Sequence, residues 1–509
     1  MESEVGVARR VASNAFNPFM AQIVTKVLLL GYAVVLYRAL GGGELGAYFL
    51  AGYVLLYTST ISEWGLGTLL TREVAKERGS AEAVRDDFRQ TLALRLFISL
   101  LLFVPVGLFI LIYTSLFDLG TAGAWTVVVL TLSLLPGAFS GTVTSLLNAY
   151  ERMTVPALVG IGTSVLNVAL GLGALALGWG IIGLALASLL STLATALYFA
   201  RILRRDFPEV GAPVAGLRLS RDAAVALLKT GWPLMLNALL VGLFFRVDQF
   251  IIQPVLGDLG VEKYQAAYSY LNFVLLITPV VTLALFPRMA RHARDDISRL
   301  NYEYGFALKV LLVLAGLIVV MTVWFAPLLI TIVTGGKQIY LPDSPVALQI
   351  LIFFLPFSFV NGVTQYVLIA LDKQRLITGA FALTVAFNVI ANLVLIPLIG
   401  INGAALTTVL SELVLLGPFL VWVGRFIGPV PVVALAWKPL VAGLVAGALM
   451  WLGWSLFVQW KSDTTAFALY VGAGIGFALA YGLVLLLLRP FTSGELASFR
   501  SILSRRSKS

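Results

Sequence analysis

The chain of 509 residues has no cysteine, a single histidine, and charged side chains at only 12% of its positions. Without cysteine it forms no disulfide and offers no thiolate for catalysis or metal binding. His292 lies in a basic segment with Arg291 and Arg294, which argues against a histidine proton relay or a histidine metal site. Glycine-rich phosphate loops are also missing. The sequence therefore predicts no metal, no cofactor, no catalytic residue and no enzyme.

Apolar residues are correspondingly abundant: they make up 60% of the chain, and the mean hydropathy is +0.96. A soluble domain would carry about a quarter charged residues. Apolar stretches of about 20 residues, the length that crosses roughly 30 Å of hydrocarbon, recur along the whole chain. We expect an all-α polytopic membrane protein with fourteen spans, at residues 17–38, 45–69, 90–113, 123–148, 155–177, 181–203, 230–253, 264–287, 304–333, 345–371, 376–398, 402–424, 438–458 and 465–488.

The net charge of +10 is unevenly distributed over the connections between these spans. Most Lys and Arg residues lie in the terminal segments and in every second connection, and this bias marks the cytoplasmic side. The sequence thus predicts a protein of the cytoplasmic membrane with both termini in the cytoplasm, in contact with anionic lipids rather than nucleic acid. The basic residues in connections on the opposite side are Arg38, Lys263, Lys337 and Lys461.

An internal duplication organises the chain. Residues 149–170 align with 370–391 at an offset of 221, which places Asn167 on Asn388, and an earlier stretch aligns Gly41 with Gly257 at an offset of 216. Two six-helix units with the same orientation, related by a pseudo-two-fold axis along the membrane normal, are typical of alternating-access transporters. We expect an N-lobe at 1–205, a cytoplasmic linker at 206–229, a C-lobe at 230–428, and two extra helices with a basic tail at 429–509.

Charged residues inside predicted spans are candidates for function, because an isolated charge in the bilayer is costly. Lys26 lies near the middle of the first span, where it can bind phosphate or sugar, or pair with Glu63 of the second span. Arg246 is a candidate phosphate ligand, since a guanidinium binds two oxygens at once. Asp248 points about 200° away from Arg246 on the helix, so at least one of the two should face the cavity between the lobes. Asp248 is either a coupling-ion site or a structural partner.

Other polar residues have competing interpretations. Glu412 in the twelfth span aligns with Thr192, so it is either a proton-coupling group or part of a polar network between helices. Lys309 lies near a helix end, where it is expected to extend toward lipid head groups. Arg38 flanks the first external turn and either is structural or lines the outer mouth. The aligned Asn167 and Asn388 are expected to link neighbouring helices.

Three segments carry a resemblance to a known family: YRALGGGELGAYFLAGYVLLYTSTISEWGLGTLLTREVAKE at 37–77, and the aligned repeats at 145–188 and 368–406. They resemble the polysaccharide-biosynthesis (oligosaccharide) flippases of the multidrug/oligosaccharidyl-lipid/polysaccharide exporter superfamily. The resemblance implies a MATE-like fold of two lobes. It also implies that the protein flips an undecaprenyl-diphosphate-linked oligosaccharide to the outer leaflet for cell-surface polysaccharide synthesis.

The implied partners are the lipid-linked glycan, membrane lipids, a proton or sodium counter-ion, and a polysaccharide polymerase or glycosyltransferase. Three alternatives stay open: an ion-coupled multidrug or small-molecule antiporter of the same superfamily, a flippase for the peptidoglycan lipid precursor, and a membrane glycosyltransferase or polymerase. The last would need a sizeable external loop, and the predicted external connections are short.

Overall fold

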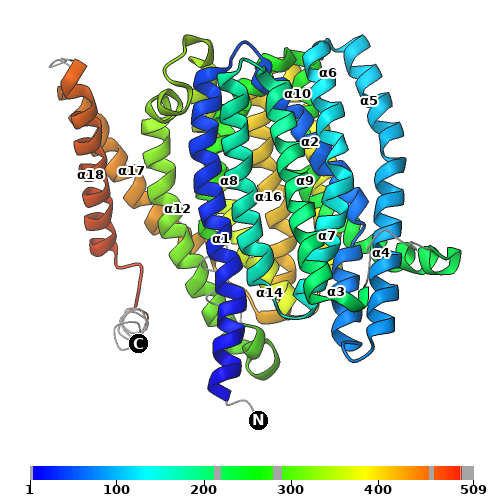
Figure 1. Ribbon diagram of the computed structural model, residues 1–509. Helices are drawn as coiled ribbons and strands as arrows, with labels where there is room; N and C mark the ends of the chain where they lie inside the picture. Colours follow the sequence, from blue (N-terminus) through cyan, green and yellow to red (C-terminus); the bar gives the residue numbers. More distant parts are fainter. Residues whose placement is uncertain (1–3, 211–218, 279–288, 458–462, 493–494, 496–509) are drawn as a thin grey trace. The chain divides into compact units, whose positions relative to one another are not determined.

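The computed structural model describes residues 4–210, 219–278, 289–457, 463–492 and 495 (Figure 1). Within this part of the chain all regular secondary structure is helical, as predicted. The helices are α1 (Glu4–Ala39), α2 (Glu44–Glu63), α3 (Leu66–Lys76), α4 (Ala81–Leu101), α5 (Phe103–Leu116), α6 (Gly120–Leu132), α7 (Leu134–Ala149), α8 (Thr154–Ala176), α9 (Gly180–Asp206), η1 (Pro208–Val210), α10 (Arg221–Val274), α12 (Ile297–Thr334), η2 (Gln338–Tyr340), α13 (Asp343–Leu351), α14 (Phe354–Ala370), α15 (Gln374–Ile399), α16 (Ile401–Ile427), α17 (Val432–Phe457) and α18 (Asp463–Leu488).

Twelve helical segments of the described residues are long and apolar enough to cross a membrane, and Gly472–Leu488 is a shorter apolar helix. The protein is therefore a multi-pass membrane protein, as expected. The sequence predicted fourteen spans, two more than this count. Part of the difference arises because α10 contains the whole predicted span at 230–253 and the beginning of the one at 264–287. The two are joined through Gly257, whose φ of 69° and ψ of −177° are not helical. The end of that second span, at 279–287, lies outside the described residues.

Four predicted spans, at 45–69, 90–113, 123–148 and 345–371, each consist of two helices in the structure. The span at 45–69 breaks between α2 and α3, where Trp64 (φ 47°) and Gly65 (φ 74°) adopt the left-handed conformation. Glycine takes this conformation without strain. The Glu63 carboxylate accepts hydrogen bonds from the backbone N–H groups of Gly65 (2.7 Å) and Gly67 (2.8 Å). It thereby satisfies two donors at the start of α3 that have no partner within the helix.

The chain divides into two compact units. The first contains Met1–Ser269, Thr331–Leu341 and Val389–Ala404, and the second contains Tyr270–Ile330, Pro342–Asn388 and Ala405–Ser509.

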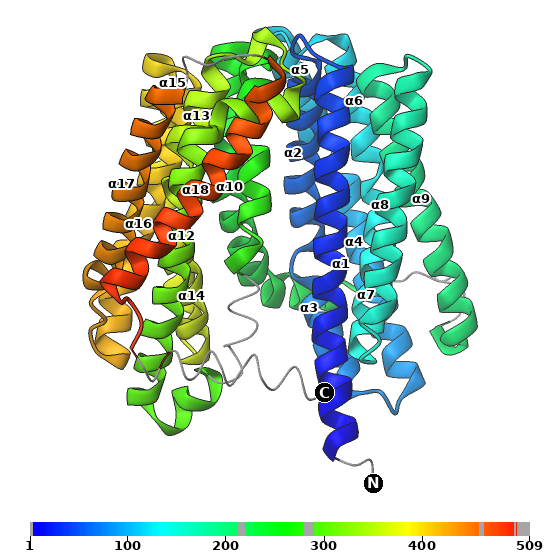
Figure 2. The ribbon, with the colours of Figure 1, turned by 90° about the vertical axis from the view of Figure 1, so that its left-hand side faces the viewer.

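The described residues of the first unit form three buried apolar clusters. One joins α3, α4, α7 and α9 around Phe88 and Leu146, and a second joins α2, α6 and α9 around Leu50 and Val127. The third contains Leu66, Leu94 and Leu134. The helix α1 lies beside α8 (Figures 1 and 2). Gly171 of α8 makes this approach possible, because a Cβ atom there would lie 1.8 Å from the Tyr32 hydroxyl. Small residues let helices approach closely, which matters in lipid, where packing rather than water exclusion drives helix association.

In the second unit, α17 and α18 pack against α12 (Figure 2). The sequence repeat has no counterpart for these two helices. Their contact contains Phe325 of α12, Ala446 of α17 and Phe477 of α18. The Tyr481 hydroxyl donates a hydrogen bond of 2.8 Å to the Val313 carbonyl of α12. This pair of helices is therefore fixed to the second unit by both packing and hydrogen bonding.

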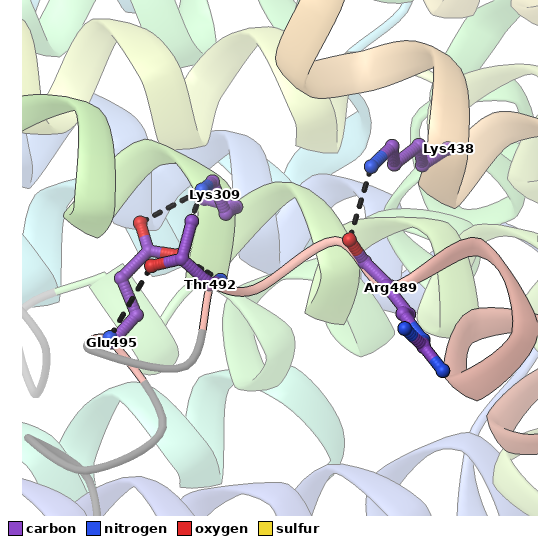
Figure 3. Close-up of polar contacts among 5 residues, drawn as sticks. All are labelled: Lys309, Lys438, Arg489, Thr492 and Glu495. Carbon is purple, nitrogen blue, oxygen red and sulfur yellow. Dashed lines mark hydrogen bonds and ion pairs between the residues drawn. The ribbon is translucent and has the colours of Figure 1, made fainter.

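The segment after α18 is held to α12 by an ion pair (Figure 3). The Lys309 ammonium lies 2.7 and 3.0 Å from the two Glu495 carboxylate oxygens, and the side chains are 14% and 5% exposed. The backbone N–H groups of Thr492 and Glu495 bond reciprocally to the Glu495 and Thr492 side chains, as in a capping box. Burial opposes ionisation of Glu495, but the hydrogen bonds from Lys309 and Thr492 outweigh it and lower the pKa of this carboxyl. The expectation that Lys309 extends to lipid head groups was therefore wrong: a carboxylate 186 residues away binds it.

Candidate functional site

Arg246 lies among aromatic rings in the first unit. Its guanidinium carbon is 4.1 Å from the centre of the Tyr268 ring and 5.4 Å from that of Tyr53 in α2. The Tyr53 hydroxyl donates a hydrogen bond of 2.6 Å to the Gln265 side chain, which fixes the ring. A cation over an aromatic face is stabilised by the ring's negative quadrupole. The tyrosine rings thus stabilise the positive charge of Arg246.

Lys26 of α1 is an exposed cation that the same unit brings toward Arg246. The two are close enough for Arg246 to repel the Lys26 ammonium electrostatically. Among the described residues, no carboxylate lies within ion-pair distance of Lys26. Two cations that repel each other in a medium of low dielectric constant form a favourable place for an anion.

The pair between Lys26 and Glu63, one of the two predicted interpretations, is not formed. Both Glu63 oxygens accept backbone hydrogen bonds at the α2–α3 break. The cation that Glu63 stabilises electrostatically is Arg95 of α4, which is buried. Gly141 of α7 makes room for it, since a Cβ atom there would lie 2.7 Å from the Arg95 guanidinium. Glu63 therefore holds a helix break and faces Arg95.

Asp248 is a buried carboxylate on α10, two residues from Arg246. It accepts hydrogen bonds from the backbone N–H of Gln249 (2.8 Å) and from the Tyr264 hydroxyl, and it attracts Arg246 electrostatically. The first unit thus brings Lys26, Arg246 and Asp248 into one electrostatic network, with two cations and one carboxylate.

Glu412 lies in a different environment, in the interior of the second unit. The Asn361 side-chain amide of α14 donates hydrogen bonds to both the Glu412 carboxylate (2.6 Å) and its backbone carbonyl (2.9 Å). Ser358, one turn earlier on α14, also bonds the carboxylate. Near this site, Asn388 of α15 donates to the Ser411 hydroxyl of α16 at 2.9 Å, as expected of a residue that links helices. Glu412 therefore belongs to a polar network between α14 and α16.

Arg38, at the end of α1, lines a cavity of about 570 Å³ in the first unit, together with Lys337. Its guanidinium donates a hydrogen bond of 2.9 Å to the Ile332 carbonyl.

Several residues of these sites were not predicted from the sequence. Arg95 lies inside the predicted span at 90–113, and that position alone was a signal that it is buried. Tyr53 lies in the 37–77 segment that carries the family resemblance. Tyr268 and Gln265 gave no signal, because aromatic and amide side chains are ordinary residues of membrane helices. Within the described residues, no group of three or more His, Asp or Glu side chains is placed to hold a metal ion.

A fold of apolar helices with charged residues held inside it is that of a polytopic membrane protein, and the comparisons identify the chain as a transporter. The family model described as "Polysaccharide biosynthesis protein" matches residues 11–293, and the MatE model matches residues 233–410. The chain belongs to the polysaccharide biosynthesis protein family, within the multidrug/oligosaccharidyl-lipid/polysaccharide exporter superfamily. No curated protein sequence matches it.

Solved structures agree on the fold. The lipid II flippase MurJ in an inward closed conformation is 16% identical, with a TM-score of 0.73 over 92% of this chain and 98% of that one. A multidrug resistance MATE family transporter in an inward-facing conformation is 20% identical, with a TM-score of 0.60 over 81% and 95%. A transporter of the same superfamily from Pyrococcus furiosus is 17% identical, with a TM-score of 0.58 over 83% and 96%. These similarities confirm the predicted MATE-like fold.

Proposed function

We propose that the protein flips a lipid-linked oligosaccharide, carried on undecaprenyl diphosphate, from the cytoplasmic to the outer leaflet of the cytoplasmic membrane by alternating access. Both termini then lie in the cytoplasm. The observation that carries the proposal is the pair of cations Lys26 and Arg246 in the first unit, the second of which lies over two tyrosine rings. A diphosphate carries the complementary charge, and Arg binds two phosphate oxygens at once.

In this mechanism Lys26 and Arg246 bind the diphosphate, and the tyrosine rings keep the Arg246 guanidinium oriented while the site is empty. Asp248 balances part of the positive charge, so that the diphosphate is bound but can also be released. Glu412 is the candidate group for coupling to a proton or sodium gradient, with Asn361 holding its carboxyl in place. Glu63 and Arg38, the other predicted site residues, act respectively at the α2–α3 break and at the far end of α1.

A second function has one specific observation in its favour. The MatE model covers residues 233–410, which include Arg246 and Asp248 and end two residues before Glu412. An ion-coupled antiporter for organic cations would use a carboxylate such as Asp248 to bind its substrate. The two cations of the first unit weigh against it, because a cationic drug would have to bind next to Lys26 and Arg246.

The test is transbilayer movement of a fluorescent polyprenyl-diphosphate oligosaccharide in proteoliposomes, with a proton gradient, a sodium gradient or neither. Movement that requires the protein supports the proposal, and its dependence on the gradients names the coupling ion. Absence of movement for several glycans, together with efflux of an organic cation such as ethidium, would assign the protein to the antiporters instead.

A further inference from the structure

A second cationic site lies at the carboxyl-terminal end of α1. Two of the four basic residues predicted on the outer side, Arg38 and Lys337, line one cavity of about 570 Å³, with Thr331, Ile332, Thr334 and Gly335 as its other walls. They are 299 positions apart in the sequence and belong to the same compact unit. Lys461, another of the four, lies outside the described residues.

Backbone carbonyls, rather than carboxylates, position the two cations. Arg38 donates to the Ile332 carbonyl at 2.9 Å, and the Lys337 ammonium donates to the Leu40 carbonyl at 2.5 Å. Among the described residues neither cation has a carboxylate partner. A guanidinium has five N–H donors and an ammonium three, so most of their donors are available to a ligand.

Glycines make the room that this arrangement needs. A Cβ atom at Gly41 would lie 3.3 Å from the Lys337 ammonium, and one at Gly335 would lie 3.0 Å from the Arg38 side chain. Gly335 also has a φ of 70°, which side chains rarely tolerate. The chain thus keeps side chains away from both cations.

The surroundings of the cavity indicate an amphipathic ligand. Ile332, which lines it, is 45% exposed. Val35, one turn before Arg38, is also exposed, as are Val24 and Val27 further along α1. On a membrane helix such a face contacts lipid chains, so the two cations lie where an apolar surface ends. Lys and Arg at such a position attract the phosphate of a lipid.

We infer that this cavity binds the phosphate group of a lipid at the outer membrane surface, either the diphosphate of a polyprenyl carrier or the phosphate of a phospholipid head group. The inference rests on the proposed function for the orientation of the chain. Arg38 provides a planar fork of donors and Lys337 a point charge, a combination that holds a tetrahedral anion from two sides. With a polyprenyl carrier bound, the cavity is a docking place for the flipped lipid before it leaves the protein.

The absence of cysteine makes a local measurement possible. Gln338 is exposed and follows Lys337 directly, so the full chain with Gln338→Cys can be labelled there with an environment-sensitive fluorophore. The labelled protein, in nanodiscs of phosphatidylcholine, is titrated with a polyprenyl diphosphate. Separate titrations use phosphatidylglycerol and inorganic phosphate. A signal at residue 338 reports this cavity rather than the site at Lys26 and Arg246.

Four versions of the labelled protein are compared: the unmodified site, Arg38→Gln with Lys337→Gln, the charge-preserving Arg38→Lys with Lys337→Arg, and the control Arg72→Gln with Lys76→Gln. The control removes the same two charges at exposed positions of α3. We expect the neutral pair to raise the Kd about tenfold or more, which is the loss of one charge-assisted hydrogen bond. The charge-preserving pair and the control should stay within about twofold.

Each outcome decides the question. A response to polyprenyl diphosphate with none to phosphatidylglycerol identifies the carrier as the ligand, and the reverse identifies a phospholipid. Competition by inorganic phosphate alone shows a site for free phosphate and contradicts the lipid part of the inference. Equal affinity in the neutral pair overturns the site. Failure of the unmodified protein to flip glycans would refute the proposed function but not this site, because the fluorophore measures binding.

Discussion

Replacing Lys26 and Arg246 one at a time separates a role in substrate binding from a role in folding. The two cations have different surroundings: Lys26 is exposed and has no carboxylate partner among the described residues, whereas Arg246 lies 4.1 Å from the Tyr268 ring centre and 5.4 Å from that of Tyr53. We expect Lys26→Gln and Arg246→Gln each to abolish flipping, while only the second destabilises the protein.

The magnitudes follow from the contacts. A cation–aromatic contact away from water contributes about 2 kcal/mol, so Arg246→Gln should lower the free energy of unfolding by about that amount. Lys26→Gln should change it by less than about 0.5 kcal/mol, as for other exposed positions. For binding, each loses a charge-assisted hydrogen bond to phosphate of about 1.5–3 kcal/mol. That corresponds to a Kd for polyprenyl diphosphate about ten- to a hundredfold higher.

The assay combines three measurements on purified protein: thermal unfolding in detergent, binding of the lipid, and flipping in proteoliposomes. Lys26→Arg keeps the charge and should retain flipping. Tyr268→Phe keeps the ring over Arg246 and should retain more stability than Tyr268→Leu. Flipping at the normal rate by Lys26→Gln and Arg246→Gln, with both proteins present at normal levels in the membrane, would refute the cationic site.

Three further changes test other parts of the structure. Glu412→Gln keeps the size of the side chain and an acceptor for the neighbouring asparagine, so lipid binding should persist while turnover slows; unchanged turnover at several pH values would make this residue structural. Glu495→Gln removes one partner of a nearly buried ion pair and should lower the free energy of unfolding by up to about 3–5 kcal/mol, measured by thermal unfolding. Adding Lys309→Gln should lower it by less than Glu495→Gln does alone. Because the folded-state pKa of Glu495 is lowered from 4.5, this stabilisation is present above about pH 4.5 and is lost as the pH falls through the lowered pKa. Unfolding midpoints measured over a series of pH values check this dependence. Gly46→Ala places a Cβ atom 1.8 Å from a backbone carbonyl oxygen, so it should lower the free energy of unfolding by about 1–3 kcal/mol or more. The control Gly52→Ala, on the same helix, places its Cβ atom in open space. In the same unfolding measurement it should be neutral or stabilising.

Hydropathy predicted the helices of this protein well, because a membrane requires about 20 apolar residues per crossing whatever the rest of the chain does. The duplication agrees with one of the boundaries that hydropathy predicted. Gly41 aligns with Gly257. The chain turns between α1 and α2 just after Gly41, and α10 has its non-helical residue at Gly257. The aligned glycine thus lies between the spans predicted at 230–253 and 264–287.

The partners of the charged residues could not be predicted in the same way. Lys26 and Arg95 were both available to Glu63, and Glu63 faces Arg95 because α2 and α4 meet in the core of the first unit. Lys309 is bound by Glu495, a residue far along the chain. Helical periodicity gives the direction of a side chain relative to its own helix axis, but the choice of partner depends on which helices pack together.

The two repeats join corresponding helices through polar contacts at different positions. In the first repeat, the hydroxyls of Thr163 and Thr195 bond at 2.5 Å between α8 and α9. In the second repeat, Asn388 and Ser411 bond at 2.9 Å between the corresponding helices α15 and α16. Each pair of helices therefore has its own polar link, made from different residues.

Glu412 is additional to these links. Its aligned residue, Thr192, bonds only to the Ser188 carbonyl one turn earlier on its own helix, at 2.8 Å. Glu412 instead accepts hydrogen bonds from Asn361 on another helix. A carboxyl is a costly choice inside a membrane protein, and the first repeat packs the equivalent helices without one. Helix packing alone thus gives no reason for its presence, which favours the interpretation that Glu412 couples transport to an ion.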